Sequence, residues 1–425
     1  MLHIKEIFYR FRTKHIIKLT LCIAVISLCF TACKRETIQK QGLLTDYEVS
    51  SYSAVFEIFW KGINSNYVYW EQDPLNWDSI RTVYKPKFLA VDSIASIDQD
   101  QAQNLAFQYM VDMTKNLKDG NYALQVNGGG DFTFADSSYK AWIRFIPKLM
   151  IASRTNPVLP DTLFDYVIPN NYLDNSDYGQ YRDLNSLQIF QAMTGTISRS
   201  SKNVQYLGLN SFMIKAGYNQ EYSSRPPVRP VMKNFFNAIK QPGCDGFILD
   251  LRNNRGGNTE DIDFFVGHLT TQSLLFGYSR YKSGSGRLDY TPTIPMYVMP
   301  QDGATDFKKK IVILTDAYTA SLSEKVIMAL KTLPGATVVT IGAPTYGSAG
   351  LVTTDGMATN SGSFDIGTFA SVALSNMAVE DTKHQFTMGG ITPDVPVVYD
   401  AAGVTQMLKT GVDIQMEAAI RNFNQ

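Results

Sequence analysis

An alternation of apolar runs and helical patterns in the second half of the chain constrains its fold most. Continuous apolar runs occur at residues 246–251, 310–315 and 337–342, and such runs are typical of strands buried on both faces of a sheet. Helical patterns accompany them at residues 231–239, 260–269 and 321–333. Strands and helices that alternate at this spacing predict a parallel, layered α/β fold.

The first half of the chain has a different pattern. Val55, Phe56, Phe59 and Trp60 recur at three- and four-residue spacing, which predicts an N-terminal helical domain over residues 51–121. Residues 122–202 mix short alternating runs with Asn, Asp, Gly and Pro, so we expect a small β-rich or irregular middle segment there. The α/β core is expected over residues 203–425.

The N-terminus has the features of an export signal. Five Lys or Arg residues against one acid in residues 1–20 precede an apolar run at residues 19–30. This order is typical of a secretory signal peptide, and a run of about 12 residues is too short to span a bilayer. The following Thr31-Ala32-Cys33 resembles a bacterial lipobox. It predicts a signal peptide over residues 1–32 and a tether over residues 33–50. Cys33 would be acylated and would hold the protein on a membrane of the bacterial cell envelope. A signal peptide cut elsewhere and an uncleaved anchor are the alternatives.

Charge and composition exclude several classes of protein. The 39 basic and 39 acidic residues give no net charge, whereas a nucleic-acid-binding protein needs a basic surplus. After removal of residues 1–32, Cys33, Cys244, His268 and His384 are the only cysteines and histidines left. Neither an intramolecular disulfide nor a Cys- or His-rich metal centre is therefore expected, and no organic cofactor is implied.

Two segments carry residues suited to acyl transfer. Residues 250–257 (Asp-Leu-Arg-Asn-Asn-Arg-Gly-Gly) follow a predicted strand, and Gly256 and Gly257 would let backbone N–H groups face a cleft and stabilise an oxyanion. Ser321 precedes a predicted helix, where the helix N-terminus favours negative charge. Both segments also have simpler interpretations. The glycines suit a turn that closes a strand, and Ser321 with Glu324 has the spacing of a capping box.

These two segments and two later ones occur in a recognisable order. They are residues 250–257, 319–324 (Thr-Ala-Ser-Leu-Ser-Glu), 342–347 (Gly-Ala-Pro-Thr-Tyr-Gly) and 390–394 (Gly-Ile-Thr-Pro-Asp). Over residues 203–425 the chain resembles the tail-specific (C-terminal-processing) protease family, and its N-terminal helical segment has a weaker similarity to the tricorn-core branch.

The resemblance implies a fold, a site and a class of substrate. The fold would be a crotonase-like (ClpP/crotonase) layered core. Ser321 would be the nucleophile, and Gly256, Gly257 and the Leu322 N–H would line the oxyanion hole. Peptides or unfolded proteins would be the substrates.

The sequence departs from the family at the residues that activate the serine. In the tail-specific branch a Lys follows the Thr-x-Gly of the third block and a Gln lies four residues later; these positions hold Ser348 and Val352. In the tricorn-like branch a His follows Asp-Gly and a Glu precedes the fourth block; these positions hold Asn121 and Thr387. Both base arrangements are thus expected to be lost.

Several residues are candidate substitutes for the base. His384 precedes the fourth block, and Lys325 follows the candidate nucleophile on the same helix, although a lysine there is expected to extend to water. Glu380 and Asp381 could orient a base but not deprotonate a serine alone. His268 is expected to be structural. Two functions therefore remain open: a serine-type peptidase-like lipoprotein, and a catalytically inactive relative that binds peptide or another ligand in the same cleft.

Overall fold

The computed structural model describes residues 49–126, 143–220, 225–353 and 359–424. The predicted signal peptide, Cys33 and nearly all of the predicted tether lie outside the described residues. The described residues belong to one compact unit, Thr45–Gln425. No helix among them is both long and apolar enough to cross a membrane.

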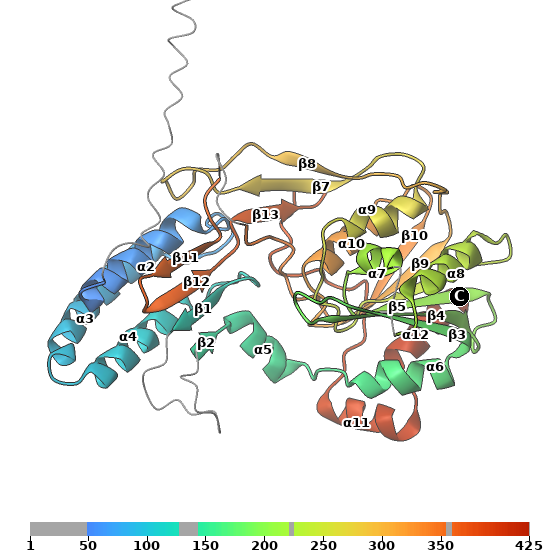
Figure 1. The fold of residues 1–425 in the computed structure, drawn as a ribbon, viewed down its shortest axis with the longest axis horizontal. Coiled ribbons are helices and arrows are strands. Elements are labelled where there is room, and N and C mark those ends of the chain that lie inside the picture. Colours follow the sequence, from blue (N-terminus) through green and yellow to red (C-terminus); the bar gives the residue numbers. More distant parts are fainter. Residues whose placement is uncertain (1–48, 127–142, 221–224, 354–358, 425) are drawn as a thin grey trace, which may run out of the picture. The chain divides into compact units, whose positions relative to one another are not determined.

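A seven-stranded sheet lies at the centre of the second half of the chain (Figure 1). Its order is β14-β10-β9-β6-β5-β4-β3, and β5, β6, β9, β10 and β14 are parallel. The apolar runs therefore form adjacent parallel strands, as predicted, and the middle segment adds an antiparallel hairpin. The strands are β3 (Leu173–Arg182), β4 (Ile189–Ile197), β5 (Val204–Leu209), β6 (Gly246–Asp250), β9 (Lys310–Thr315), β10 (Thr337–Gly342) and β14 (Val395–Pro396).

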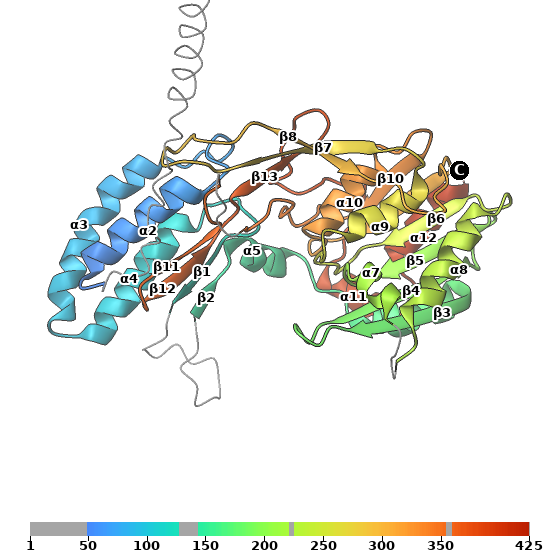
Figure 2. The same cartoon turned by 45° about the horizontal axis from the view of Figure 1, so that its top comes forward.

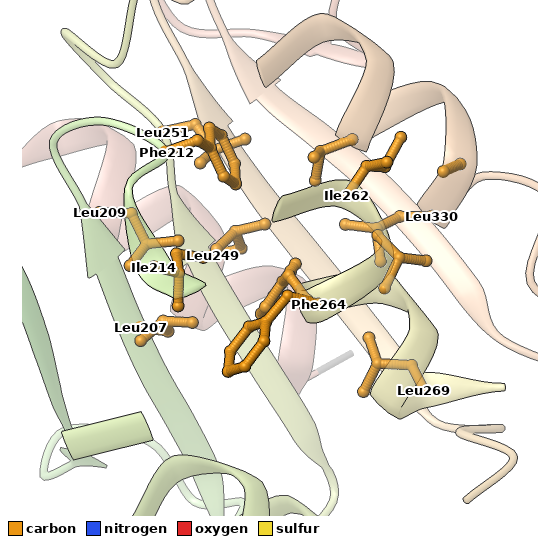
Figure 3. Close-up of a cluster of buried hydrophobic side chains, with 14 of the residues drawn as sticks. Leu207, Leu209, Phe212, Ile214, Leu249, Leu251, Ile262, Phe264, Leu269 and Leu330 are labelled. Atoms are coloured by element: carbon orange, nitrogen blue, oxygen red, sulfur yellow. The ribbon is translucent and has the colours of Figure 1, made fainter. Parts of the chain in front are cut away.

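Helices cover both faces of this sheet because successive strand residues point to opposite sides. Leu249 of β6 packs with α8 (Val228–Lys240), α9 (Asp261–Val266) and α10 (Leu322–Leu330). Its neighbour Ile248 packs on the other side with α12 (Ile414–Asn424). Figure 3 shows part of the first cluster, where Leu207, Leu209 and Leu249 meet Phe264 and Leu330. The result is a mixed α/β fold of helix, sheet and helix.

Three helices and a second sheet form a separate hydrophobic core. The helices are α2 (Tyr52–Asn66), α3 (Trp77–Ala95) and α4 (Gln99–Thr114), and the sheet has the order β11-β12-β1-β2. Its strands are β1 (Ala123–Val126), β2 (Ile143–Phe145), β11 (Ser363–Ile366) and β12 (Ala370–Ala373). Leu124 of β1 lies opposite Val372 of β12. Segments on both sides of the expected boundary at residue 203 therefore share this core (Figures 1 and 2).

A third sheet, of order β13-β7-β8, covers α10 (Figure 2). It contains β7 (Leu274–Tyr281), β8 (Ile294–Val298) and β13 (Met377–Glu380). A Cβ placed on Gly277 of β7 would lie 3.1 Å from the Met328 methyl carbon of α10, so strand and helix are in close contact. The remaining elements are α5 (Pro147–Thr155), η2 (Leu163–Val167), α6 (Ile168–Asn171), α7 (Ile214–Asn219), η3 (Gly267–Leu269) and α11 (Ala401–Thr410).

Candidate active site

Ser321 lies between β9 and α10 with an unusual backbone conformation. Its φ is 57° and its ψ is −116°, a region that non-glycine residues rarely adopt and that occurs at functional sites. Gly256 makes this conformation possible. Its φ is +92°, and a Cβ there would lie 2.8 Å from both the Ser321 Cβ and the Leu322 nitrogen. The structure therefore brings together the predicted nucleophile, the following N–H and one of the two glycines.

Hydrogen bonds join the loop after β6 to the loop after β9. The Asp316 carboxylate accepts the N–H groups of Asn253, Tyr318 and Thr319, each at 2.9 Å. The Ala320 N–H donates to the Asn254 carbonyl at 3.0 Å. Because buried backbone groups need partners, these bonds hold the approach to Ser321 rigidly against the glycine segment.

The two glycines have different surroundings. The Gly256 N–H donates to Asn254 Oδ1 at 2.9 Å, so this group, predicted to be an oxyanion donor, is already engaged. Gly257 lies against Phe212, whose carbonyl oxygen would be 2.1 Å from an added Cβ. Within the described ranges, the N–H groups of Gly257 and Leu322 have no hydrogen-bond partner. The N–H donors free to receive an oxyanion are therefore those of Gly257 and Leu322. Gly256, which has no side chain, leaves room for Ser321 and the Leu322 nitrogen beside it.

Glu324 links the start of α10 to the third sequence block. Its Oε2 accepts the N–H groups of Ser321 at 3.0 Å and Ser348 at 2.8 Å. Its Oε1 accepts the Thr345 hydroxyl at 2.6 Å and the Gly347 N–H at 2.7 Å. Burial raises the pKa of Glu324, and these four hydrogen bonds oppose the rise. The Glu324 half of the capping box that the spacing predicts is present, because its carboxylate accepts the Ser321 N–H, whereas the Glu324 N–H donates to the Ser321 carbonyl at 3.1 Å. The same carboxylate also fixes the loop beside Ser321.

The four positions of the expected base residues lie in different surroundings. Ser348 is buried, and its Oγ accepts the Ser321 N–H at 3.2 Å. The Asn121 amide donates at 2.9 Å to the Gly350 carbonyl and, at the same distance, to the Ser375 hydroxyl. Thr387 is buried and donates to the Val379 carbonyl at 3.3 Å, and Val352 is 41% exposed. Of the four, Ser348 contacts Ser321 directly.

A comparison of the sequence with known families identifies one domain of the chain. Residues 203–397 match the model of peptidase family S41. The chain carries a peptidase family S41 domain. All four sequence blocks lie within the matched residues.

One curated relative and one solved structure are similar to the chain. The chain is 26% identical over 225 residues to the carboxyl-terminal-processing protease of Synechocystis sp., an alignment that covers 52% of the chain and 44% of the relative. The chain thus spans less than half the length of that curated relative. The fold is similar to that of a candidate peptidase from Parabacteroides merdae ATCC 43184, with a TM-score of 0.61, 22% identity, and coverage of 88% of this chain and 98% of that one.

Neither histidine of the described residues joins the hydrogen bonds around Ser321 of the S41 domain. The His384 Nδ1 lies 2.9 Å from Glu380 Oε2, and 57% of the His384 side chain is exposed. The His268 Nδ1 lies 2.5 Å from the Phe264 carbonyl, and burial lowers the pKa of this imidazole. Asp381 accepts backbone N–H groups of its own turn.

Lys325 is mostly buried. The residue is only 5% exposed, so at most the tip of its side chain reaches water, and the expectation of an extended lysine holds only that far. Its ammonium forms no hydrogen bond or ion pair with any described residue. Burial lowers the pKa of Lys325 to about 8, and the nearby Glu324 carboxylate opposes the shift.

A second lysine near Glu324 is not evident from the sequence. Lys148 belongs to α5, whose Leu149 and Ala152 pack with Tyr318 and Tyr346. Burial lowers the pKa of Lys148, and Glu324 again opposes the shift. No local pattern signals that α5 packs beside the loops of the S41 domain.

Asp250 and Arg252, the first two charged residues of the block 250–257, have a structural role. The Arg252 guanidinium is buried and donates to Asp250 at 2.5 and 2.8 Å. It also donates to Asp413 at 2.7 Å and to the Gln415 side chain at 3.0 Å. Planar, multiple contacts of this kind suit arginine. They attach the end of β6 to the start of α12.

Proposed function

We propose that this protein is a serine-type peptidase that cleaves peptides or unfolded proteins by acyl transfer, with Ser321 as its nucleophile. The observation that carries the proposal is the position of Ser321, held at the start of α10 in a strained conformation against Gly256. The match of residues 203–397 to peptidase family S41 supports the reaction class. The helix, sheet and helix layers support a crotonase-like core.

The available N–H groups suggest how charge would be stabilised. Attack of the Ser321 oxygen on a peptide carbonyl places negative charge on the carbonyl oxygen. The N–H groups of Leu322 and Gly257 are the donors for that oxygen, and the N-terminal end of α10 adds its dipole. Removal of one such donor typically costs ~10²–10³-fold in rate, so these groups are a large part of the proposed catalysis.

We propose further that the protein is lipid-anchored through Cys33 to a membrane of the bacterial cell envelope. The basic, apolar and small-residue segments that precede Cys33 support this location. We expect the full-length protein to sediment with membranes, and Cys33→Ala to appear uncleaved or in the soluble fraction. Equal behaviour of the two proteins would contradict the anchor.

A specific observation favours the alternative of a ligand-binding relative without activity. Ser348 occupies the position of the family's lysine, and its hydroxyl, which is not a base, accepts the Ser321 backbone N–H. A protein of this kind would bind unstructured peptides without cleaving them.

One experiment separates the two functions. Full-length protein in detergent would be treated with a serine-directed phosphonate and assayed with unstructured peptides. We expect labelling and cleavage in the wild type, and neither in Ser321→Ala. Ser363→Ala, at an exposed serine of β11, is the matched control and should behave as the wild type. Peptide binding with neither labelling nor cleavage would establish the alternative.

A further inference from the structure

Lys325 lies one helical turn after Ser321. Its N–H donates to the Ser321 carbonyl at 3.3 Å. Ser321 is the N-cap, with a non-helical φ of 57°, and this backbone hydrogen bond places Lys325 in the first turn of α10 after it. Helical side chains lean toward the N-terminus, and the Lys325 side chain therefore extends over the turn that begins at Ser321.

The third sheet contacts α10 close to Lys325. Met328, three residues after Lys325, packs its methyl group against Gly277 of β7. Lys325 itself is only 5% exposed although its side chain is long and charged. Its nitrogen is not among the enclosed polar atoms of the described residues that lack a partner, so the stem of the side chain is buried while its tip keeps contact with water.

A mostly buried lysine whose ammonium bonds to no described residue is unusual. Lysine is almost never buried unless it is paired, yet Lys325 is only 5% exposed and its ammonium has no hydrogen bond or ion pair among the described residues. The neighbouring Glu324 carboxylate is fully used by four other donors. An unpaired titratable group of this kind beside a candidate nucleophile indicates a functional role.

We propose that Lys325 is the general base that activates Ser321, in place of the base residues that this sequence lacks. The inference rests on the proposed peptidase function. A serine and a lysine near the start of one helix also serve acyl transfer in β-lactamases and penicillin-binding proteins, where the lysine lies three residues after the serine instead of four as here. The lowered pKa of Lys325, about 8, keeps part of the amine neutral near neutral pH.

The proton transfers balance without a further reactant. The neutral Lys325 amine takes the Ser321 hydroxyl proton as the bond from Oγ to the substrate carbonyl carbon forms. The C–N bond then breaks, and the leaving amine takes the proton from Lys325. A water molecule gives a proton to Lys325 and attacks the acyl carbon, after which the departing Ser321 oxygen recovers that proton. Peptide and water become a carboxylic acid and an amine.

The test compares lysine variants of the full-length protein in detergent. We would measure kcat/KM from pH 6 to 10 with a fluorogenic unstructured peptide for the wild type, Lys325→Met, Lys325→Arg, Lys148→Met and Ser321→Ala. Met keeps the volume of the buried side chain, and Arg keeps the charge but cannot lose its proton. Urea unfolding would verify that each variant folds.

The expected results follow from the loss of the base. The wild-type rate should rise with an apparent pKa near 8. Lys325→Met and Lys325→Arg should lose ~10²–10⁴-fold and should no longer show this rise. Lys148→Met should stay within about tenfold of the wild type and keep the pH profile, because on this proposal its amine takes no proton from Ser321.

Three results would overturn the inference. Full activity in Lys325→Met, with none in Ser321→Ala, would exclude Lys325 as the base and leave the proposed function intact. Loss of activity and of the pH profile in Lys148→Met alone would transfer the role to Lys148. A wild type that neither cleaves peptide nor accepts the phosphonate would remove the function and the base together.

Discussion

The Ser348 hydroxyl oxygen lies 3.2 Å from the Ser321 backbone nitrogen. The same N–H also donates to Glu324, which receives the Ser348 N–H as well. Two residues of the second sequence block and the residue that follows the third block are therefore joined around a single backbone nitrogen. The conformation of Ser321 depends on this small network. We expect Ser348 and Glu324 to contribute differently to the free energy of unfolding.

Replacement of Ser348 by Ala should have a modest effect. The Ser321 N–H keeps its bond to Glu324, so the change removes one hydrogen bond at a cost of about 1 kcal/mol. Replacement of Glu324 by Gln should cost about 3 kcal/mol, because the amide NH₂ would face N–H donors that now bind an oxygen. Urea unfolding measures both values. A Glu324→Gln protein as stable as Ser348→Ala would contradict the role of Glu324 in this network.

Gly256→Ala should disrupt the site. The added Cβ would meet the Ser321 Cβ and the Leu322 nitrogen at 2.8 Å, and φ at this position is +92°. We expect labelling of Ser321 by the phosphonate to fall at least ~10²-fold, since Leu322 and Ser321 must both move. Gly243→Ala is the control, because an added Cβ there has no atom within 4 Å. Similar labelling rates in the two variants would show that the close contact is not required.

Arg252→Met should be strongly destabilising. It leaves the buried carboxylates of Asp250 and Asp413 without their cation, which typically costs about 3–5 kcal/mol. Lys215→Met removes an exposed ion pair with Glu260 and should change stability by less than about 1 kcal/mol. Thermal or urea unfolding distinguishes the two cases. Equal stability of both variants would mean that the buried cluster does not anchor α12.

Lys325→Met should increase stability in a pH-dependent way. The folded pKa of Lys325, about 8, lies below the ordinary value of 10.5, so the folded state disfavours the protonated amine. The penalty is fully present below pH 8, decreases as pH rises from 8 to 10.5, and is absent above. At about 1.4 kcal/mol per pH unit it amounts to about 3 kcal/mol. Unfolding of both proteins at pH 7 and pH 10.5 measures it. A Lys325→Met protein no more stable than the wild type at pH 7 would show that the lysine is paired or hydrated.

The parts of the structure that the sequence predicts are those with local signals. The apolar runs of β6, β9 and β10 are long enough to indicate buried parallel strands, and the family resemblance of the blocks implies that Ser321 lies near Gly256, as it does. The burial of Lys325 could not be predicted, because it depends on the packing of α10 against elements from other parts of the chain, among them α9 and β7. The approach of Lys148 and the engagement of the Gly256 N–H by Asn254 likewise depend on tertiary contacts.

The pairing of β1 with β12 has a consequence for biosynthesis. Ala123 and Ala373 are partners in one ladder although 250 positions separate them. At a typical elongation rate of about 5–20 residues per second, the ribosome needs roughly 10–50 seconds to make the missing strand. During that interval the N-terminal helices can assemble, but β1 keeps an open edge that another chain could occupy. Correct folding of this protein therefore requires that β12 is synthesised and pairs with β1 before a strand of another chain does. Slower synthesis lengthens the time during which such intermolecular pairing can occur.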